Sequence, residues 1–131
     1  MHRRVTFVTL LVNDFDEAVA FYVEKLGFIK TADNQFGPDM RWVSVSPQQG
    51  SETEIVFVKA DTPEKKRLVG SQVAGHVLMV LGTSNCDDDF RKLTNRGVKF
   101  HGIPKDVPWG REVLFEDLYG NLFDLVERRG N

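Results

Sequence analysis

Cysteine is nearly absent from this sequence, which narrows the class of protein at once. One cysteine, Cys86, occurs in 131 residues, so no disulfide can form within the chain. Small extracellular domains commonly depend on disulfides, whereas cytosolic proteins keep their thiols reduced. We therefore expect a cytoplasmic protein that is stabilised by a hydrophobic core.

Long apolar runs and an excess of one charge are also missing. No stretch approaches the roughly 20 consecutive apolar residues that a membrane-spanning helix requires. The run Val5–Val12 is short, and Asn13 and Asp14 end it as they would end a strand rather than a signal peptide. The 17 basic and 19 acidic residues give a net charge of -2. We therefore expect neither a membrane nor a nucleic acid as a partner.

What the sequence does contain is a regular order of strands and helices. Val5–Val12 is rich in β-branched residues and predicts a buried strand. Asp14, with Glu17 three residues later, predicts a capped helix over about 15–26, which Gly27 ends. The other elements predicted in this half are strands over 41–46 and 52–59, joined by a turn at 47–50, and a short helix that begins near 62–64.

The same order begins again in the second half. The segment 75–81 predicts a strand, and Ser84 with Asp87 predicts the cap of a second helix, which Gly97 ends. The remaining predicted elements are strands over 98–101, 112–116 and 121–127, with a turn at 117–120. Such self-similarity predicts an α+β domain made of two copies of one unit, packed against each other around a cleft.

Matched positions of the two copies carry polar residues. An offset of about 70 residues brings Phe7 onto His76 and Glu54 onto Asp124. Strand alternation places each acid on a face with apolar neighbours, and a buried carboxylate normally requires a partner, hydrogen bonds or a metal. We predict that Glu54, His76 and Asp124 converge on one cavity. The alternative is that each acid lies at an exposed edge, or that Asp124 pairs with Arg111.

Five segments of the chain form recognisable motifs, at residues 7–14, 20–22, 26–28, 75–77 and 117–127. Together they resemble the vicinal oxygen chelate superfamily, which includes glyoxalases, bleomycin-resistance proteins and extradiol dioxygenases. The resemblance covers nearly the whole chain. It implies two paired βαβββ modules that form an open, strongly curved mixed sheet around a cavity, commonly as a homodimer. The modules are expected at about 4–60 and 74–129, with a linker and short helix at 61–73.

The resemblance also implies a set of metal ligands with one member missing. His76, Glu54 and Asp124 match three ligand positions of metal-bearing members, which hold Ni²⁺, Zn²⁺, Mn²⁺ or Fe²⁺. Phe7 stands where those members usually carry His or Gln, and a phenyl ring cannot coordinate a metal. The remaining imidazole and two carboxylates are not the 2-His-1-carboxylate triad of iron oxygenases, so a dioxygenase is disfavoured.

Because Phe7 replaces one metal ligand, we consider two functions. The first is a metal-independent small-molecule-binding protein of the bleomycin-resistance kind. Its pocket would be largely apolar and aromatic. The residues expected to contact the ligand are Phe7, Phe36, Met40, Trp42, Trp109 and Arg111. For Trp42 the alternative is core packing, and for Trp109 it is a structural turn.

The second function is a metal-dependent lyase or isomerase of the glyoxalase type, with Glu54, His76 and Asp124 as ligands and catalytic groups. A metal-free acid–base enzyme that uses His76 and a purely structural dimerisation module remain as further alternatives. Metal content and the effect of His76→Ala distinguish these readings.

Overall fold

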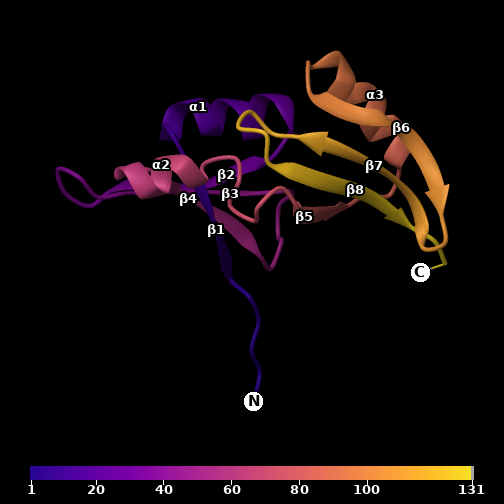
Figure 1. The fold of residues 1–131 in the computed structure, drawn as a ribbon. Coiled ribbons are helices and arrows are strands. Elements are labelled where there is room, and N and C mark those ends of the chain that lie inside the picture. The colour runs from indigo at the N-terminus through magenta and orange to yellow at the C-terminus, as the bar shows by residue number, and fades with distance from the viewer. Residues whose placement is uncertain (131) are drawn as a thin grey trace. The chain divides into compact units, whose positions relative to one another are not determined.

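The computed structural model describes residues 1–130 and divides the chain into two compact units, Met1–Val69 and Gly70–Asn131. Each unit holds one four-stranded mixed sheet, and the strand orders β1-β4-β3-β2 and β5-β8-β7-β6 are the same arrangement repeated. The predicted α+β fold with two βαβββ units is confirmed (Figure 1). Within residues 1–130, no helix is both long and apolar enough to cross a membrane.

The elements of the first unit follow the predicted order. They are β1 (Phe7–Val12), α1 (Phe15–Val19), η1 (Ala20–Lys25), β2 (Ile29–Gln35), β3 (Arg41–Ser46), β4 (Glu54–Lys59) and α2 (Pro63–Leu68). The elements of the second unit are β5 (Val77–Gly82), α3 (Cys86–Asn95), β6 (Lys99–Val107), β7 (Gly110–Glu116) and β8 (Leu122–Arg128).

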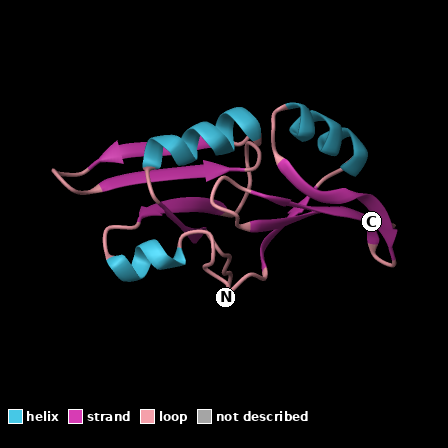
Figure 2. Cartoon of the chain, turned by 45° about the horizontal axis from the view of Figure 1, so that its top comes forward, coloured by secondary structure: helices cyan, strands magenta, loops and turns pink. Residues whose placement is uncertain are grey.

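In the first unit, one helical segment covers one face of the sheet. Asp14 caps this segment as predicted, since its Oδ1 accepts from the backbone N–H of Asp16 at 2.9 Å. The segment continues as the π-helical turns of η1 and carries the buried Tyr22. Figure 2 shows the helical segment, in cyan, lying along strands of this unit. The Tyr22 ring lies 5.4 Å from that of Phe57 on β4, centroid to centroid. Strand alternation therefore directs the neighbours of Phe57 on β4, Val56 and Val58, to the opposite, open face.

The second unit is built in the same way. Helix α3 packs on its sheet through Phe90, whose ring lies 4.8 Å from that of Phe100 on β6. Phe115 on β7 and Phe123 on β8 stack with centroids 5.0 Å apart and are almost fully buried. These rings form the core of the unit, so the alternate residues of β7 and β8 lie on the face away from α3.

Local details differ from the sequence-based prediction in three places. The strand β2 was not predicted, because it consists largely of exposed polar residues and its order comes from pairing with β3. The cap of α3 is Asn85 rather than Ser84, since the Asn85 side chain accepts from the backbone N–H of Asp88. The strand β6 extends to Val107 instead of ending near His101, because a register shift lets it pair with β7 again after the irregularity.

Candidate functional site

The open face of the first sheet carries a pocket of about 1000 Å³. Leu10, Val43 and Phe57 are buried on the opposite face, beneath the helical segment, and Phe57 also contributes to the pocket wall. Phe7 and Thr9 of β1 and Val56 of β4 alternate with these and line the pocket. The other lining residues are Phe15 of α1, Val58 and Lys59 of β4, Asp61, Lys65, and residues 35, 36 and 38–42 of the hairpin formed by β2 and β3. All of these residues belong to the first unit.

One end of the pocket is aromatic. The rings of Phe7 and Trp42 meet edge to face, with centroids 5.1 Å apart and an interplanar angle of 88°. These two side chains remain 39% and 37% exposed, although large aromatic side chains in a folded domain are usually more deeply covered. Phe36 and Met40 also line the pocket, and each is 65% exposed. Apolar surface of this extent in a concave site is typical of a ligand pocket.

Arg41 stabilises the hairpin that forms one wall of the pocket. Its Nε and a terminal nitrogen donate to the two carboxylate oxygens of Asp33, both at 2.9 Å. The same terminal nitrogen donates to Asp16 at the start of α1 at 3.0 Å, and the guanidinium lies 5.3 Å from the Phe15 ring centroid. The hydrogen bond from Arg41 lowers the pKa of Asp33 to about 2. This network connects β2, β3 and α1.

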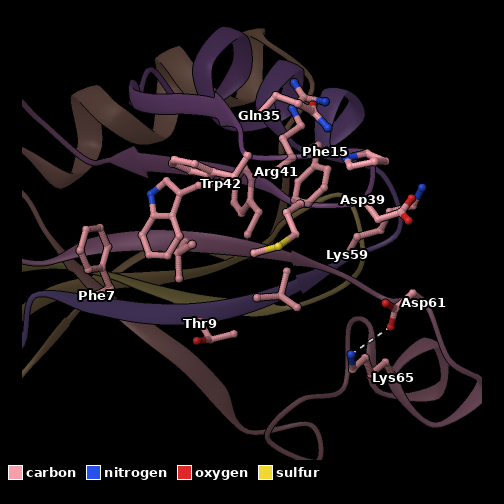
Figure 3. A pocket seen from close by; sticks show the side chains of 16 residues that line it. Phe7, Thr9, Phe15, Gln35, Asp39, Arg41, Trp42, Lys59, Asp61 and Lys65 are labelled. Carbon is pink, nitrogen blue, oxygen red and sulfur yellow. Dashed lines mark hydrogen bonds and ion pairs between the residues drawn. The ribbon is translucent and has the colours of Figure 1, made fainter.

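The other end of the pocket is charged, as Figure 3 shows: Lys59, Asp61 and Lys65 lie away from Phe7 and Trp42. Lys65 donates to Asp61 at 2.9 Å, an exposed ion pair between residues four apart in the chain. Asp39, in the hairpin, is a further acid that lines the pocket. The pocket therefore joins an aromatic surface to a group of charges within one unit.

The three residues predicted as catalytic or metal-binding belong to different units. Glu54 is the first residue of β4, half-buried and directly opposite Phe7 of β1. His76 and Asp124 belong to the second unit. Their convergence with Glu54 stays a prediction.

His76 does not lie within the strand where it was expected. β5 begins at Val77, and His76 lies exposed in the turn before it. The backbone N–H of His76 donates to the Val73 carbonyl at 3.2 Å. A register shift between Val77 and Met79 also breaks the alternation that would place His76 on the same face as Val80. The prediction that His76 lies within the strand is therefore wrong.

Asp124 is the third residue of β8, on the face away from α3, and neighbours Leu114 across the strand pair. Its Oδ1 is buried and has no hydrogen-bond partner among residues 1–130. Burial and then the nearby Glu112 carboxylate raise the pKa of Asp124 to about 6. Asp124 is therefore a buried acid that lies near a second acid, Glu112, an arrangement that strand alternation alone did not predict.

The two residues of the second unit that were predicted to contact a ligand have other partners. Trp109 is 54% exposed, and its indole N–H donates to Glu112 at 3.0 Å. Arg111 pairs with Asp87 and Asp106. These ion pairs replace the considered pairing of Arg111 with Asp124. Phe7, Phe36, Met40 and Trp42, by contrast, all line the first-unit pocket.

A metal site does not arise within either unit taken by itself. Over residues 1–130, no three His, Cys, Asp or Glu side chains of one unit gather in a way that could hold a metal ion. The position opposite Glu54 is occupied by the apolar ring of Phe7. The donor atoms within each unit therefore do not fit a metal, and no step through one follows from them.

Comparison with known proteins places this chain in a family. The model of the Glyoxalase/Bleomycin resistance protein/Dioxygenase superfamily matches residues 4–125. An uncharacterized protein of Shewanella frigidimarina is 38% identical over 128 residues, which cover 97% of this chain and 95% of the relative.

Two solved structures are similar in both fold and sequence. A member of the same superfamily from Sphaerobacter thermophilus has a TM-score of 0.83 and 38% identity, and the match covers 97% of this chain and 98% of that one. TnmS3, described as an antibiotic binding protein from Streptomyces sp. CB03234, has a TM-score of 0.79 and 35% identity, with 97% of both chains covered.

The repeated βαβββ units and the matches over nearly the full length agree. The chain belongs to the Glyoxalase/Bleomycin resistance protein/Dioxygenase superfamily, as its sequence motifs indicated.

Proposed function

We propose that this protein binds a small, planar aromatic molecule in the pocket of the first unit and does so without a metal. The observation that carries the proposal is the exposed edge-to-face pair of Phe7 and Trp42 at one end of a cavity of about 1000 Å³. Cavities of this size accommodate a drug-sized molecule and bury most of its surface.

The chemistry of the wall supports an aromatic ligand. Phe7, Trp42 and Phe36 offer ring faces and edges, and Met40 offers a polarizable thioether. Aromatic ligands gain from offset or edge-to-face contacts with such rings beyond the burial of area. Phe7 also occupies the position where metal-bearing relatives carry a ligand atom, which favours binding over metal-assisted chemistry.

The relatives support the same proposal. TnmS3 shares 35% identity over nearly the whole chain and is an antibiotic-binding protein. A pocket that sequesters an organic molecule is consistent with that description. The proposed cytoplasmic location and homodimer are separate predictions, and light scattering on the purified protein tests the second.

Binding can be measured directly, because the chain has only two tryptophans, Trp42 and Trp109. In a Trp109→Phe protein, all tryptophan emission comes from Trp42. We expect the neutral probe anthracene-2-carboxamide to quench this emission saturably, with one probe bound per chain. Failure of naphthalene, anthracene and phenanthrene carboxamides to bind up to their solubility limits would overturn the proposal.

Metal content separates binding from the glyoxalase-type alternative. We expect negligible Ni²⁺, Zn²⁺, Mn²⁺ or Fe²⁺ by elemental analysis after incubation and gel filtration, with ligand binding unaffected by a chelator. About one metal per chain, lost in a folded His76→Ala variant, would instead support the lyase or isomerase with Glu54, His76 and Asp124.

A further inference from the structure

The charged groups along the first-unit pocket are not equally available to a ligand. Arg41 is held by Asp33 and Asp16, both outside the pocket wall. Lys65 is held by Asp61. Among residues 1–130, no partner forms an ion pair with Lys59, although Lys59 lines the pocket. Lys59 is therefore the cation of the pocket wall that an incoming anion meets without first breaking an ion pair.

We propose that the ligand is an aromatic acid, and that Lys59 Nζ receives its carboxylate, sulfonate or phenolate oxygen. The inference rests on the proposed binding function and narrows it to one class of ligand. The rings would occupy the surface formed by Phe7 and Trp42, and the acidic group would point toward the charged end of the pocket (Figure 3).

The place of Lys59 in the sheet favours this role. Lys59 is the last residue of β4, and its backbone lies opposite Val12 in the parallel pairing with β1. The three residues before it, Val56–Val58, also line the pocket. Strand alternation directs the Lys59 side chain to the same side of β4 as Phe57, which also lines the pocket. Lys59 is exposed at the end of the strand, so its ammonium group stays in water.

The nearby charges have opposing effects on an anion. Lys65 closes an ion pair with Asp61, and the charge of Lys59 also contributes to the lowered pKa of Asp61. Asp61 is therefore paired with Lys65 and also lies within the electrostatic influence of Lys59. Asp39 is the competing feature, because it lines the pocket from the loop between Phe36 and Met40 and would favour a cationic ligand. The test must distinguish Lys59 from Asp39.

Three probes of one shape provide that distinction: anthracene-2-carboxylate, anthracene-2-carboxamide and 2-(aminomethyl)anthracene, which are anionic, neutral and cationic near neutral pH. In the wild-type protein we expect the carboxylate to bind about tenfold more tightly than the carboxamide, as a charge-assisted hydrogen bond contributes. The cationic probe should bind no better than the carboxamide. The preference for the carboxylate should shrink between about 50 and 500 mM NaCl, because salt screens exposed charges.

Lys59→Met keeps the length of the apolar stem and removes the charge. We expect it to lower carboxylate affinity to that of the carboxamide, while the affinity for the carboxamide changes less than about twofold. Lys59→Arg should keep most of the preference. Lys66→Met, a matched change on α2 outside the pocket wall, should leave all three affinities unchanged.

Each other outcome has a definite meaning. Equal wild-type affinity for the carboxylate and the carboxamide, or an equal loss of both in Lys59→Met, would overturn the role of Lys59 while leaving the binding function intact. Preference for the cationic probe, lost in Asp39→Asn, would overturn the assignment of an acidic ligand. Absence of binding by all three probes would contradict the proposed function itself.

Discussion

Phe7 lies directly opposite Glu54 in the parallel pairing of β1 with β4, so both side chains occupy the open face of the first sheet. Glu54 is half-buried there. The Phe7 ring cannot coordinate a metal, and it makes an edge-to-face contact with the Trp42 ring. The position that the family resemblance assigns to a metal ligand is therefore part of an aromatic wall in this chain. The consequences can be tested at single residues.

The aromatic end of the pocket should dominate the affinity for any aromatic probe. We expect Phe7→Ala and Trp42→Ala each to weaken anthracene-2-carboxamide binding about tenfold or more, because each removes ring contacts and exposes the other ring. Fluorescence anisotropy of the probe measures this. Trp109→Ala is the matched control, since Trp109 is an exposed tryptophan of the second unit. An equal loss in the control would contradict the assignment of the pocket.

The Arg41–Asp33 pair should make stability depend on acid pH. The pKa of Asp33 is lowered to about 2, so its contribution to folding is present above the unfolded value of 3.8 and is lost as the pH falls through about 2. We expect Arg41→Ala to reduce the free energy of unfolding by roughly 1 kcal/mol at neutral pH, after allowance for solvent screening. Urea unfolding between pH 2 and 4 should then show a shallower dependence on pH.

A double-mutant cycle with Asp33→Ala supplies the control for that effect. If the two residues stabilise the protein through each other, the double variant should lose less stability than the sum of the single variants. Strictly additive losses would mean that Arg41 contributes through its contacts with Asp16 and the Phe15 ring instead.

Asp124 should have the opposite effect on how the free energy of unfolding depends on pH. Its pKa is raised to about 6 by burial and by the Glu112 carboxylate. Between the unfolded value of 3.8 and about 6, the folded state holds the proton that the unfolded state has released, so this residue lowers stability as the pH rises. Asp124→Asn should flatten that decline in urea unfolding measured from pH 4 to 7.

Glu112→Gln tests the cause of the shift. Removal of the neighbouring charge should lower the pKa of Asp124 partway toward its ordinary value, because burial, the larger cause, remains. The decline in stability with pH should therefore be reduced but not abolished. An unchanged profile in both variants would show that Asp124 does not retain its proton as described.

Gly70 should be intolerant of any side chain. Its φ is +82°, and a Cβ atom there would lie 2.0 Å from the backbone carbonyl oxygen of Tyr119. We expect Gly70→Ala to cost about 3 kcal/mol or more, because the contact is with backbone that cannot move aside. Gly75→Ala is the matched control, with φ of +85° and nothing within 4 Å, so it should cost only about 1 kcal/mol. Similar costs in thermal unfolding would contradict the close contact.

Much of the fold could be predicted from local patterns. The β-branched run that forms β1, the cap at Asp14 and the Pro63 start of α2 depend on residues close in sequence, and the structure confirms them. The strand β2 could not be predicted in this way, because its polar residues acquire strand geometry only by pairing with β3.

For the candidate site too, some features could be predicted from the sequence and others could not. The sequence by itself determined the family, the repeated unit and the absence of a ligand atom at Phe7, since these are matters of residue identity and order. Tertiary structure alone decided that Phe7 meets Trp42 and that Arg111 pairs with Asp87. It also decided that Lys65 forms an ion pair while Lys59 forms none within the described residues 1–130. Such contacts join residues far apart in the chain or select among equivalent charges, and only packed side chains fix which pairs form.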